Sequence, residues 1–254
     1  MVARQDQTTD PQLVAELLQA RRGTAFFARK LNELTDAELD APSLLSGWTR
    51  RHLTAHVGYN ARAIARLIEW AATGVETPMY ASPEARNEEI SFGATLSPIA
   101  LRNLFDHSAV HLSVEWRDLS ATAWTEEVRT AQGRIVPVSE SIWMRTREVW
   151  VHAVDLDNGA VFSDIPPDVL RRLLTDIPAA WASRGTADGL VVLPDLRQGT
   201  RPTRSNIENT DGSTTVSGPL PALTRWATGR GTTGITAVKD GRVLAEVPAA
   251  PRWI

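Results

Sequence analysis

The sequence contains no cysteine. This absence excludes disulfide bonds, thiolate metal ligands and a thiol nucleophile carried by the chain itself. Any metal ion must therefore be held by His, Asp or Glu side chains. Any thiol chemistry must use a thiol that another molecule brings.

Two kinds of apolar segment are also missing. Residues 1–9 are polar and lack the apolar stretch of a secretory signal, and no apolar run approaches the ~18 residues of a membrane-spanning helix. The net charge of −3 gives no electrostatic reason to expect binding to nucleic acid or to an anionic membrane. We therefore expect a soluble cytoplasmic protein that has neither as a partner.

Tryptophan, in contrast, is abundant, with nine residues against two Tyr and five Phe. Aromatic surface of that size usually goes to cores or ligand pockets. Hydrophobic residues make up 43% and charged residues 22%, which is the balance of a globular rather than a disordered chain. A length of 254 residues suffices for one large domain or two ordinary ones.

The first part of the chain shows the apolar spacing of helices. Cap residues open each one, and at Asp10-Pro11 and Ser97-Pro98 a proline follows the cap. Residues 75–95 are rich in Pro, Gly, Ser and charge, which predicts a long loop, and Gln132-Gly133 predicts a turn between two short extended runs. Four long helices with one elaborate connection predict a four-helix bundle. The predicted helices span residues 10–31, 49–74, 97–116 and 139–154.

The pattern changes after about residue 163. Short alternating runs predict strands, Asp240-Gly241 predicts a hairpin turn, and 197–213 is polar and predicts a loop. The overall prediction is an α+β chain, with a helical bundle in 1–163 and a small α/β domain in 164–254. In the second domain, helices are predicted at 169–184 and 220–228, and strands at 190–193, 214–217, 235–238 and 243–247.

The strongest chemical feature is the segment Glu148-Val-Trp-Val-His152. Four residues span about one helical turn, so both side chains project from the same helix face and can bind one ion. His52 and His56 are also one turn apart in an earlier predicted helix. Either histidine can complete a set of two His and one Glu with an open coordination position, which is typical of catalytic zinc.

Simpler interpretations compete with this metal site. A Glu/His pair at this spacing is more often a surface hydrogen bond, but this one lies among apolar residues, where polar groups without partners are costly to bury. His52 directly follows two arginines, which indicates an exposed helix start, so His56, one turn deeper, is the better candidate. The pair His107 and His111 is a further candidate for metal contact.

A family resemblance is carried by residues 47–56, 82–89 and 143–155 and by the motif Gly229-Arg230-Gly231. Together these segments resemble the mycothiol-dependent maleylpyruvate isomerases, which belong to the DinB-like superfamily of metal-binding helical bundles. The resemblance covers nearly the whole chain. It implies that His56, Glu148 and His152 bind a divalent ion, with zinc as the expected metal, and it favours His56 over His52.

The resemblance also implies a functional arginine in the C-terminal domain, and the Gly-Arg-Gly motif assigns it to Arg230. Guanidinium groups bind carboxylates through two hydrogen bonds, so Arg230 is the first candidate for substrate binding and catalysis. Arg86, in the predicted loop 75–95, is a second candidate for substrate binding. On residue pattern alone, Arg230 would instead be a charge that satisfies the last carbonyls of a helix.

The family reaction converts maleylpyruvate into fumarylpyruvate, a cis-to-trans change in gentisate breakdown. A thiolate that adds reversibly to the conjugated double bond permits rotation, and coordination to zinc favours the thiolate. The resemblance thus implies mycothiol as the cofactor that supplies the thiol and maleylpyruvate as the substrate. The ligand set also accepts nickel, cobalt or iron, and the oligomeric state is left open, with a monomer compatible.

Two other functions are compatible with the same residues. A mycothiol S-transferase would share the metal site and the thiol but would conjugate other electrophiles. A non-catalytic binding protein would keep the bundle with a vestigial metal site. The intact ligand set favours an enzyme.

Overall fold

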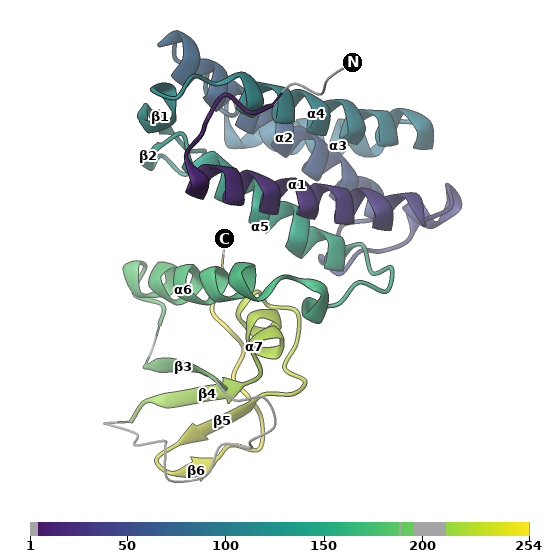
Figure 1. The fold of residues 1–254 in the computed structure, drawn as a ribbon. Helices are drawn as coiled ribbons and strands as arrows, with labels where there is room; N and C mark the ends of the chain where they lie inside the picture. The colour runs from purple at the N-terminus through teal and green to yellow at the C-terminus, as the bar shows by residue number, and fades with distance from the viewer. Residues whose placement is uncertain (1–4, 188, 196–211, 254) are drawn as a thin grey trace. The chain divides into compact units, whose positions relative to one another are not determined.

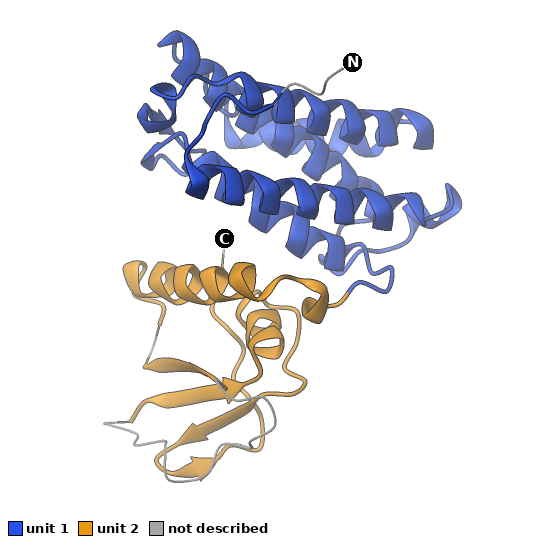
Figure 2. Ribbon diagram, in the orientation of Figure 1, with its two compact units in different colours: residues 1–160 blue, residues 161–254 orange. Residues whose placement is uncertain are grey.

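The structure is a computed structural model of the chain and describes residues 5–187, 189–195 and 212–253. The chain divides into two compact units, Met1–Ala160 and Val161–Ile254 (Figure 2). The first unit is helical, and the second combines two helices with a four-stranded sheet (Figure 1). This arrangement confirms the predicted fold class. None of the helices in the described residues is long and apolar enough to cross a membrane.

Helix α2 is the centre of the first unit, and it packs against three other helices, while α1 packs mainly against α5. The four longest helices of this unit, α1, α2, α4 and α5, are the four that the sequence predicts. A short hairpin connects α4 to α5. The elements are α1 (Pro11–Asn32), α2 (Arg50–Thr73), α3 (Pro83–Ala94), α4 (Pro98–Asp118), β1 (Glu127–Arg129), β2 (Ile135–Pro137) and α5 (Glu140–Asp155), with short 3-10 turns at Ala37–Asp40 and Ala123–Thr125.

Three of these helices begin in the same way. The side chains of Asp10, Ser82 and Ser97 each accept a hydrogen bond from a backbone N–H of the first turn, and a proline follows at the first helical position. The capping side chain satisfies an N–H that the helix cannot pair, and proline lacks one of the N–H groups that would go unpaired. These local signals therefore fix the starts of α1, α3 and α4.

The predicted loop over residues 75–95 is wrong, because its second half forms α3. Its cap, Ser82-Pro83, is the same signal as at the other two starts, but the polar composition obscured it. Only Ile90 and Gly93 of this helix are buried, so the charges belong to its exposed side. A Cβ atom at Gly93 would lie 2.7 Å from the Cβ of Ala55 on α2, so glycine lets α3 approach α2 closely.

A second close approach seats α5 against α1. A Cβ atom at Gly23 would lie 2.6 Å from Nε1 of Trp150 and 2.6 Å from Cγ2 of Val149. Nε1 of Trp150 donates to the carbonyl of Gln19, and its ring stacks on Phe26 at 5.1 Å between centroids. These contacts fix the segment of α5 that carries the candidate metal ligands.

The second unit places α6 and α7 on the same side of its sheet (Figure 1). The strand order is β3-β4-β5-β6, with β3 and β4 parallel and the other pairs antiparallel. Trp181 of α6 and Trp226 of α7 meet edge to face at 5.7 Å between ring centroids and form its core. The elements are α6 (Pro167–Ser183), β3 (Leu190–Pro194), β4 (Thr214–Gly218), α7 (Leu220–Ala227), β5 (Thr236–Lys239) and β6 (Arg242–Val243), after a 3-10 turn at Phe162–Asp164.

The last predicted strand, 243–247, is largely wrong. The turn at Asp240-Gly241 is present, with φ values of 49° and 71°, but β6 ends at Val243. Beyond Leu244 the chain leaves the sheet edge, and the Pro248 carbonyl accepts a hydrogen bond from Nε1 of Trp226 on α7. Packing on α7 therefore outweighs the strand pattern there. The predicted loop 197–213 lies outside the described residues up to residue 211.

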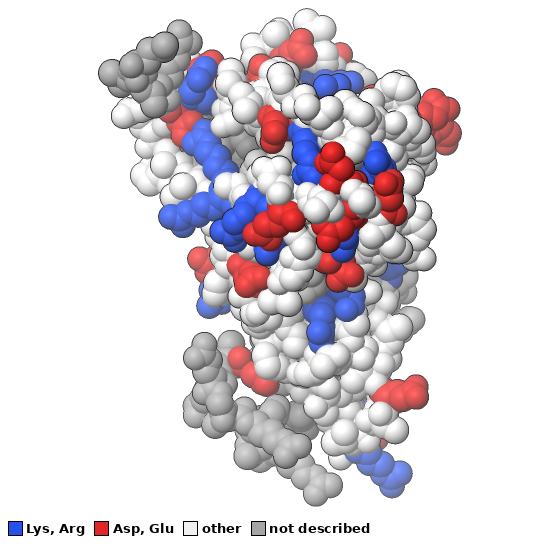
Figure 3. All heavy atoms as spheres, turned by 90° about the vertical axis from the view of Figure 1, so that its right-hand side faces the viewer, with Lys and Arg blue, Asp and Glu red and all other residues white. Residues whose placement is uncertain are grey.

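Lysine and arginine side chains are interspersed with aspartate and glutamate on the face of the molecule drawn in Figure 3. This mixture agrees with the small net charge of −3.

Candidate metal centre

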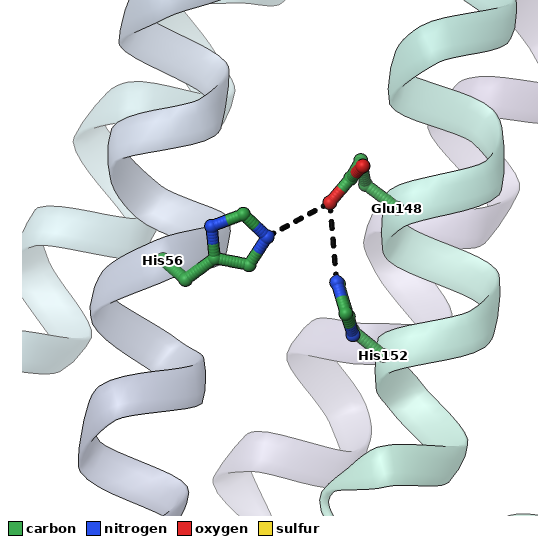
Figure 4. Close-up of side chains that lie close together, drawn as sticks. All are labelled: His56, Glu148 and His152. Carbon is green, nitrogen blue, oxygen red and sulfur yellow. Dashed lines mark hydrogen bonds and ion pairs between the residues drawn. The ribbon is translucent and has the colours of Figure 1, made fainter. Parts of the chain in front are cut away.

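Three polar side chains from two helices converge in the first unit. His56 lies on α2, whereas Glu148 and His152 lie one turn apart on α5 (Figure 4). Nε2 of His56 is 2.9 Å from Oε2 of Glu148, and Nε2 of His152 is 3.1 Å from the same oxygen. One ligand atom from each residue lies within 4.8 Å of the others, so the three side chains can share a metal ion.

His56, Glu148 and His152, called the trio below, are largely but not completely shielded from water. Their side chains are 8% exposed at His56 and 11% exposed at Glu148 and His152. The Trp48 ring stands edge-on to the His56 ring, with 5.4 Å between centroids. Shielding from water strengthens electrostatic interactions at the site, and the remaining exposure leaves access for a small ligand.

His152 lies between two carboxylates. Its Nε2 faces Glu148, and its Nδ1 is 2.8 Å from Oδ2 of Asp155, whose side chain is fully buried. Burial alone would lower the pKa of His152, but the hydrogen bonds to Asp155 and Glu148 outweigh burial and raise it to about 9. A carboxylate behind a ligating histidine fixes the orientation of the ring and the atom that faces the metal.

The other two members of the trio are shifted in the opposite direction. Burial lowers the pKa of His56, and the charges of His152 and Arg86 add to this effect against the pull of Glu148. Burial would raise the pKa of Glu148, but hydrogen bonds from His152 and His56 hold it well below its ordinary value. At neutral pH, His56 is therefore neutral, Glu148 ionised and His152 protonated when no ion is bound.

Arg86 and Tyr80 lie beside the trio. Nη2 of Arg86, on α3, is 3.3 Å from Nδ1 of His56, and its Cζ atom lies 5.9 Å from the centroid of the Tyr80 ring. Burial raises the pKa of Tyr80 to about 12, so its hydroxyl group stays protonated at neutral pH and can donate a hydrogen bond. A cation and a hydroxyl donor next to the trio suit an anionic ligand.

The remaining histidine candidates lie outside the trio. Nδ1 of His52 is 2.8 Å from the hydroxyl of Thr49, where it helps to cap the start of α2. His107 and His111 are exposed on α4, and Nε2 of His111 is 3.2 Å from a carboxylate oxygen of Glu115.

Arg230 lies in the second unit, just after α7. The flanking Gly229 and Gly231 have φ values of 81° and 112°, a region in which glycine is favoured. Nη1 of Arg230 donates to the carbonyl of Thr228, at the C-terminal end of α7. This contact matches the interpretation of Arg230 as a helix-end charge, and its role in substrate binding stays a prediction.

Sequence reasoning missed Asp155, Trp48 and Tyr80. Asp155 had a detectable signal, since it follows His152 by three residues in a predicted helix and such residues are neighbours on a helix face. Trp48 and Tyr80 lie in connections between helices, where local spacing does not show which side chain they contact.

Replacing Asp155 with asparagine should weaken zinc binding by about 10–100-fold, because the carboxylate that orients His152 and raises its basicity is lost. The zinc dissociation constant can be measured by competition with a chromophoric chelator. Asp157→Asn is the matched control, since Asp157 is exposed and asparagine tolerates its φ of 51°. Equal affinity in wild type and Asp155→Asn would show that Asp155 does not support the metal centre.

Comparisons with known proteins cover both units. Residues 20–157 match the family described as the mycothiol maleylpyruvate isomerase N-terminal domain, and residues 164–249 match the C-terminal domain of the same family. Two crystal structures are similar, one of the mycothiol-dependent maleylpyruvate isomerase and one of its variant with a histidine replaced by alanine. Each is 51% identical, covers 95% of this chain and 97% of its own, and superimposes with a TM-score of 0.86. No curated protein matches. With both domains matched over most of its length, the chain belongs to the mycothiol-dependent maleylpyruvate isomerase family.

Proposed function

We propose that the chain is a mycothiol-dependent maleylpyruvate isomerase, whose metal ion is held by His56, Glu148 and His152. The observation that carries the proposal is the convergence of both histidine Nε2 atoms on one carboxylate oxygen of Glu148. The relatives of similar fold and 51% identity are named for this activity. The reaction is the cis-to-trans isomerisation of maleylpyruvate to fumarylpyruvate.

The donor set fits zinc. Two imidazole nitrogens and one carboxylate oxygen are typical protein ligands of a catalytic zinc ion, which keeps a further position open. Asp155 behind His152 supplies the support that ligating histidines usually have. When bound, the metal ion favours the thiolate form of a thiol, and mycothiol supplies the thiol that the cysteine-free chain lacks.

The remaining residues of the proposed site act on the substrate. Maleylpyruvate carries two carboxylates, and negative charge spreads onto its conjugated oxygen as a nucleophile adds to the double bond. Arg86 lies beside the trio and is a proposed carboxylate partner, with Tyr80 as a neutral hydroxyl donor. Arg230, from the second unit, is proposed as the arginine that stabilises the developing charge.

Zinc binding should release about one proton per ion at neutral pH, because His152 is protonated there and must become neutral to bind the metal. His56 is already neutral and Glu148 already ionised, so neither contributes a proton. Apparent zinc affinity should therefore rise by about tenfold per pH unit up to about pH 9 and level off above it. Calorimetry in buffers of different ionisation enthalpy counts the protons. If zinc binding releases no proton at pH 7, or still releases one proton well above pH 9, the charge states given above are wrong.

The activity itself can be tested with purified protein of known zinc content. Maleylpyruvate should isomerise in the presence of mycothiol and not in its absence, and the free thiol concentration should not fall during turnover. Net consumption of thiol would identify an S-transferase instead. Full isomerisation without any added thiol would rule out the proposed role of mycothiol.

A further inference from the structure

Arg145 is a buried arginine that joins the two ligand-bearing helices. It lies on α5, one turn before Glu148, and is 1% exposed. Its Nη1 donates both to the carbonyl of Val57, at 2.7 Å, and to Oδ1 of Asn60, at 3.0 Å. Val57 directly follows His56 on α2, and Asn60 lies one turn beyond it. The bridge therefore runs beside the His56–Glu148 contact and connects the same pair of helices.

Burying Arg145 costs free energy, because the other nitrogen atoms of its guanidinium group are not satisfied in the part of the chain that the structure describes. Nε and Nη2 of Arg145 are enclosed and have no hydrogen-bond partner among the described residues. Burial lowers the pKa of Arg145 to about 10, although the nearby negative charge of Glu148 opposes the effect. An apolar side chain of similar length would avoid this desolvation of a cation and its N–H groups. Costs of this kind are expected where a residue serves the function rather than the stability of the fold.

We propose that Arg145 is a positioning residue of the candidate metal centre, which sets the register of α2 against α5 and so holds His56 within reach of Glu148 and His152. This role rests on the proposed metal site. His56 and Glu148 are 92 positions apart in the chain, and α2 supplies only one of the three candidate ligands. A small slide of α2 would remove His56 from the trio while leaving Glu148 and His152 together on their own helix. Ligand sets must be held to within about 0.5 Å to be productive, and this requires supporting contacts next to the ligands.

Losing the charge of Arg145 and losing its hydrogen bonds to α2 should change the metal affinity in opposite directions, so the two effects can be told apart. Removing a positive charge near a dication should by itself tighten metal binding. Arg145→Met should nevertheless weaken zinc binding by at least about tenfold, in the range of other changes behind metal ligands, because the bridge to α2 is lost. Asn60→Leu keeps the charge and the approximate volume but removes one acceptor, so it should also weaken binding, to a smaller extent. Arg145→Lys retains the charge and one donating nitrogen, so it should bind zinc more tightly than Arg145→Met and less tightly than wild type.

The measurements are the zinc dissociation constant, the visible absorption of the cobalt-substituted protein and the thermal unfolding midpoint, all on the full chain. The absorption spectrum depends on the geometry of the metal ligands. A variant that is only less stable, and still folded, should therefore keep the wild-type spectrum. Arg102→Met is the matched control. Arg102 donates to the carbonyls of Leu31 and Leu34 at 2.6 and 2.7 Å and so bridges α4 to the end of α1. The Arg102→Met substitution should lower the unfolding midpoint and leave the zinc affinity and the cobalt spectrum unchanged.

Folded Arg145→Met and Asn60→Leu proteins with wild-type zinc affinity and an unchanged cobalt spectrum would overturn the role of Arg145. If Arg145→Met does not fold, Asn60→Leu and Arg145→Lys decide the question with the charge in place. Wild-type protein that binds no zinc would instead overturn the proposed metal centre itself.

Discussion

His56→Ala should abolish retention of zinc, because it removes the only candidate ligand that α2 contributes. The loss should exceed the about 10–100-fold effect of altering a residue behind a ligand, since Glu148 and His152 alone make a two-residue site on one helix. Thermal stability of the metal-free protein should fall modestly at neutral pH, because the ionised and largely buried carboxylate of Glu148 loses its hydrogen bond from His56. Metal content after dialysis against a chelator, measured by elemental analysis, gives the result.

His52→Ala is the matched control for this experiment. The same residue type is removed one helical turn away, but His52 contacts Thr49 at the start of α2 and not the trio. It should lower stability by about 1 kcal/mol through loss of a helix cap and leave zinc content at the wild-type level. Full zinc occupancy in His56→Ala, or loss of zinc in His52→Ala alone, would refute the ligand assignment.

Arg230→Ala should lower kcat/KM for maleylpyruvate by about 100–1,000-fold, the usual cost of removing one group that stabilises developing negative charge. The fold and the zinc content should be preserved, because Arg230 lies in the second unit and the trio in the first. Circular dichroism tests the fold, elemental analysis tests the zinc content, and the isomerase assay tests kcat/KM. Arg242→Ala serves as the control, since Arg242 is an exposed arginine of the same unit.

The competing interpretation of Arg230 makes a different prediction. If its hydrogen bond to the Thr228 carbonyl is its whole function, Arg230→Ala should lower the unfolding midpoint and leave turnover intact. A kcat/KM within about twofold of wild type would therefore refute the catalytic role. Arg230→Lys adds a further distinction, since a lysine keeps the charge but not the two-pronged contact with a carboxylate.

Local signals in the sequence were sufficient to predict most helices of the first unit. The cap and proline at Asp10-Pro11 and Ser97-Pro98 mark helix starts that the structure confirms. The same signal at Ser82-Pro83 was overridden by composition, because α3 buries only two residues and has almost no apolar face to detect. In the second unit, the strand predicted at 243–247 failed because contacts with α7 draw the chain away from the sheet.

The candidate site was predictable in part for a similar reason. Glu148 and His152 are one turn apart on one helix, so their proximity follows from helix geometry. The arrival of His56 from α2 depends on tertiary packing, and sequence pattern alone left His52 in competition with it. Arg145 carries no sequence signal for its place, since arginine in a helix is ordinarily exposed and only the packing of α5 against α2 buries it.

The most direct test of the account is to remove the metal ion and return it in measured steps. Turnover of maleylpyruvate with mycothiol should vanish in the metal-free protein. It should recover in proportion to bound zinc and reach its maximum at a single ion per chain, because one group of ligands is found in the described residues. Metal-free protein that isomerises maleylpyruvate at the wild-type rate would contradict the central claim that the His56–Glu148–His152 trio is the catalytic metal centre.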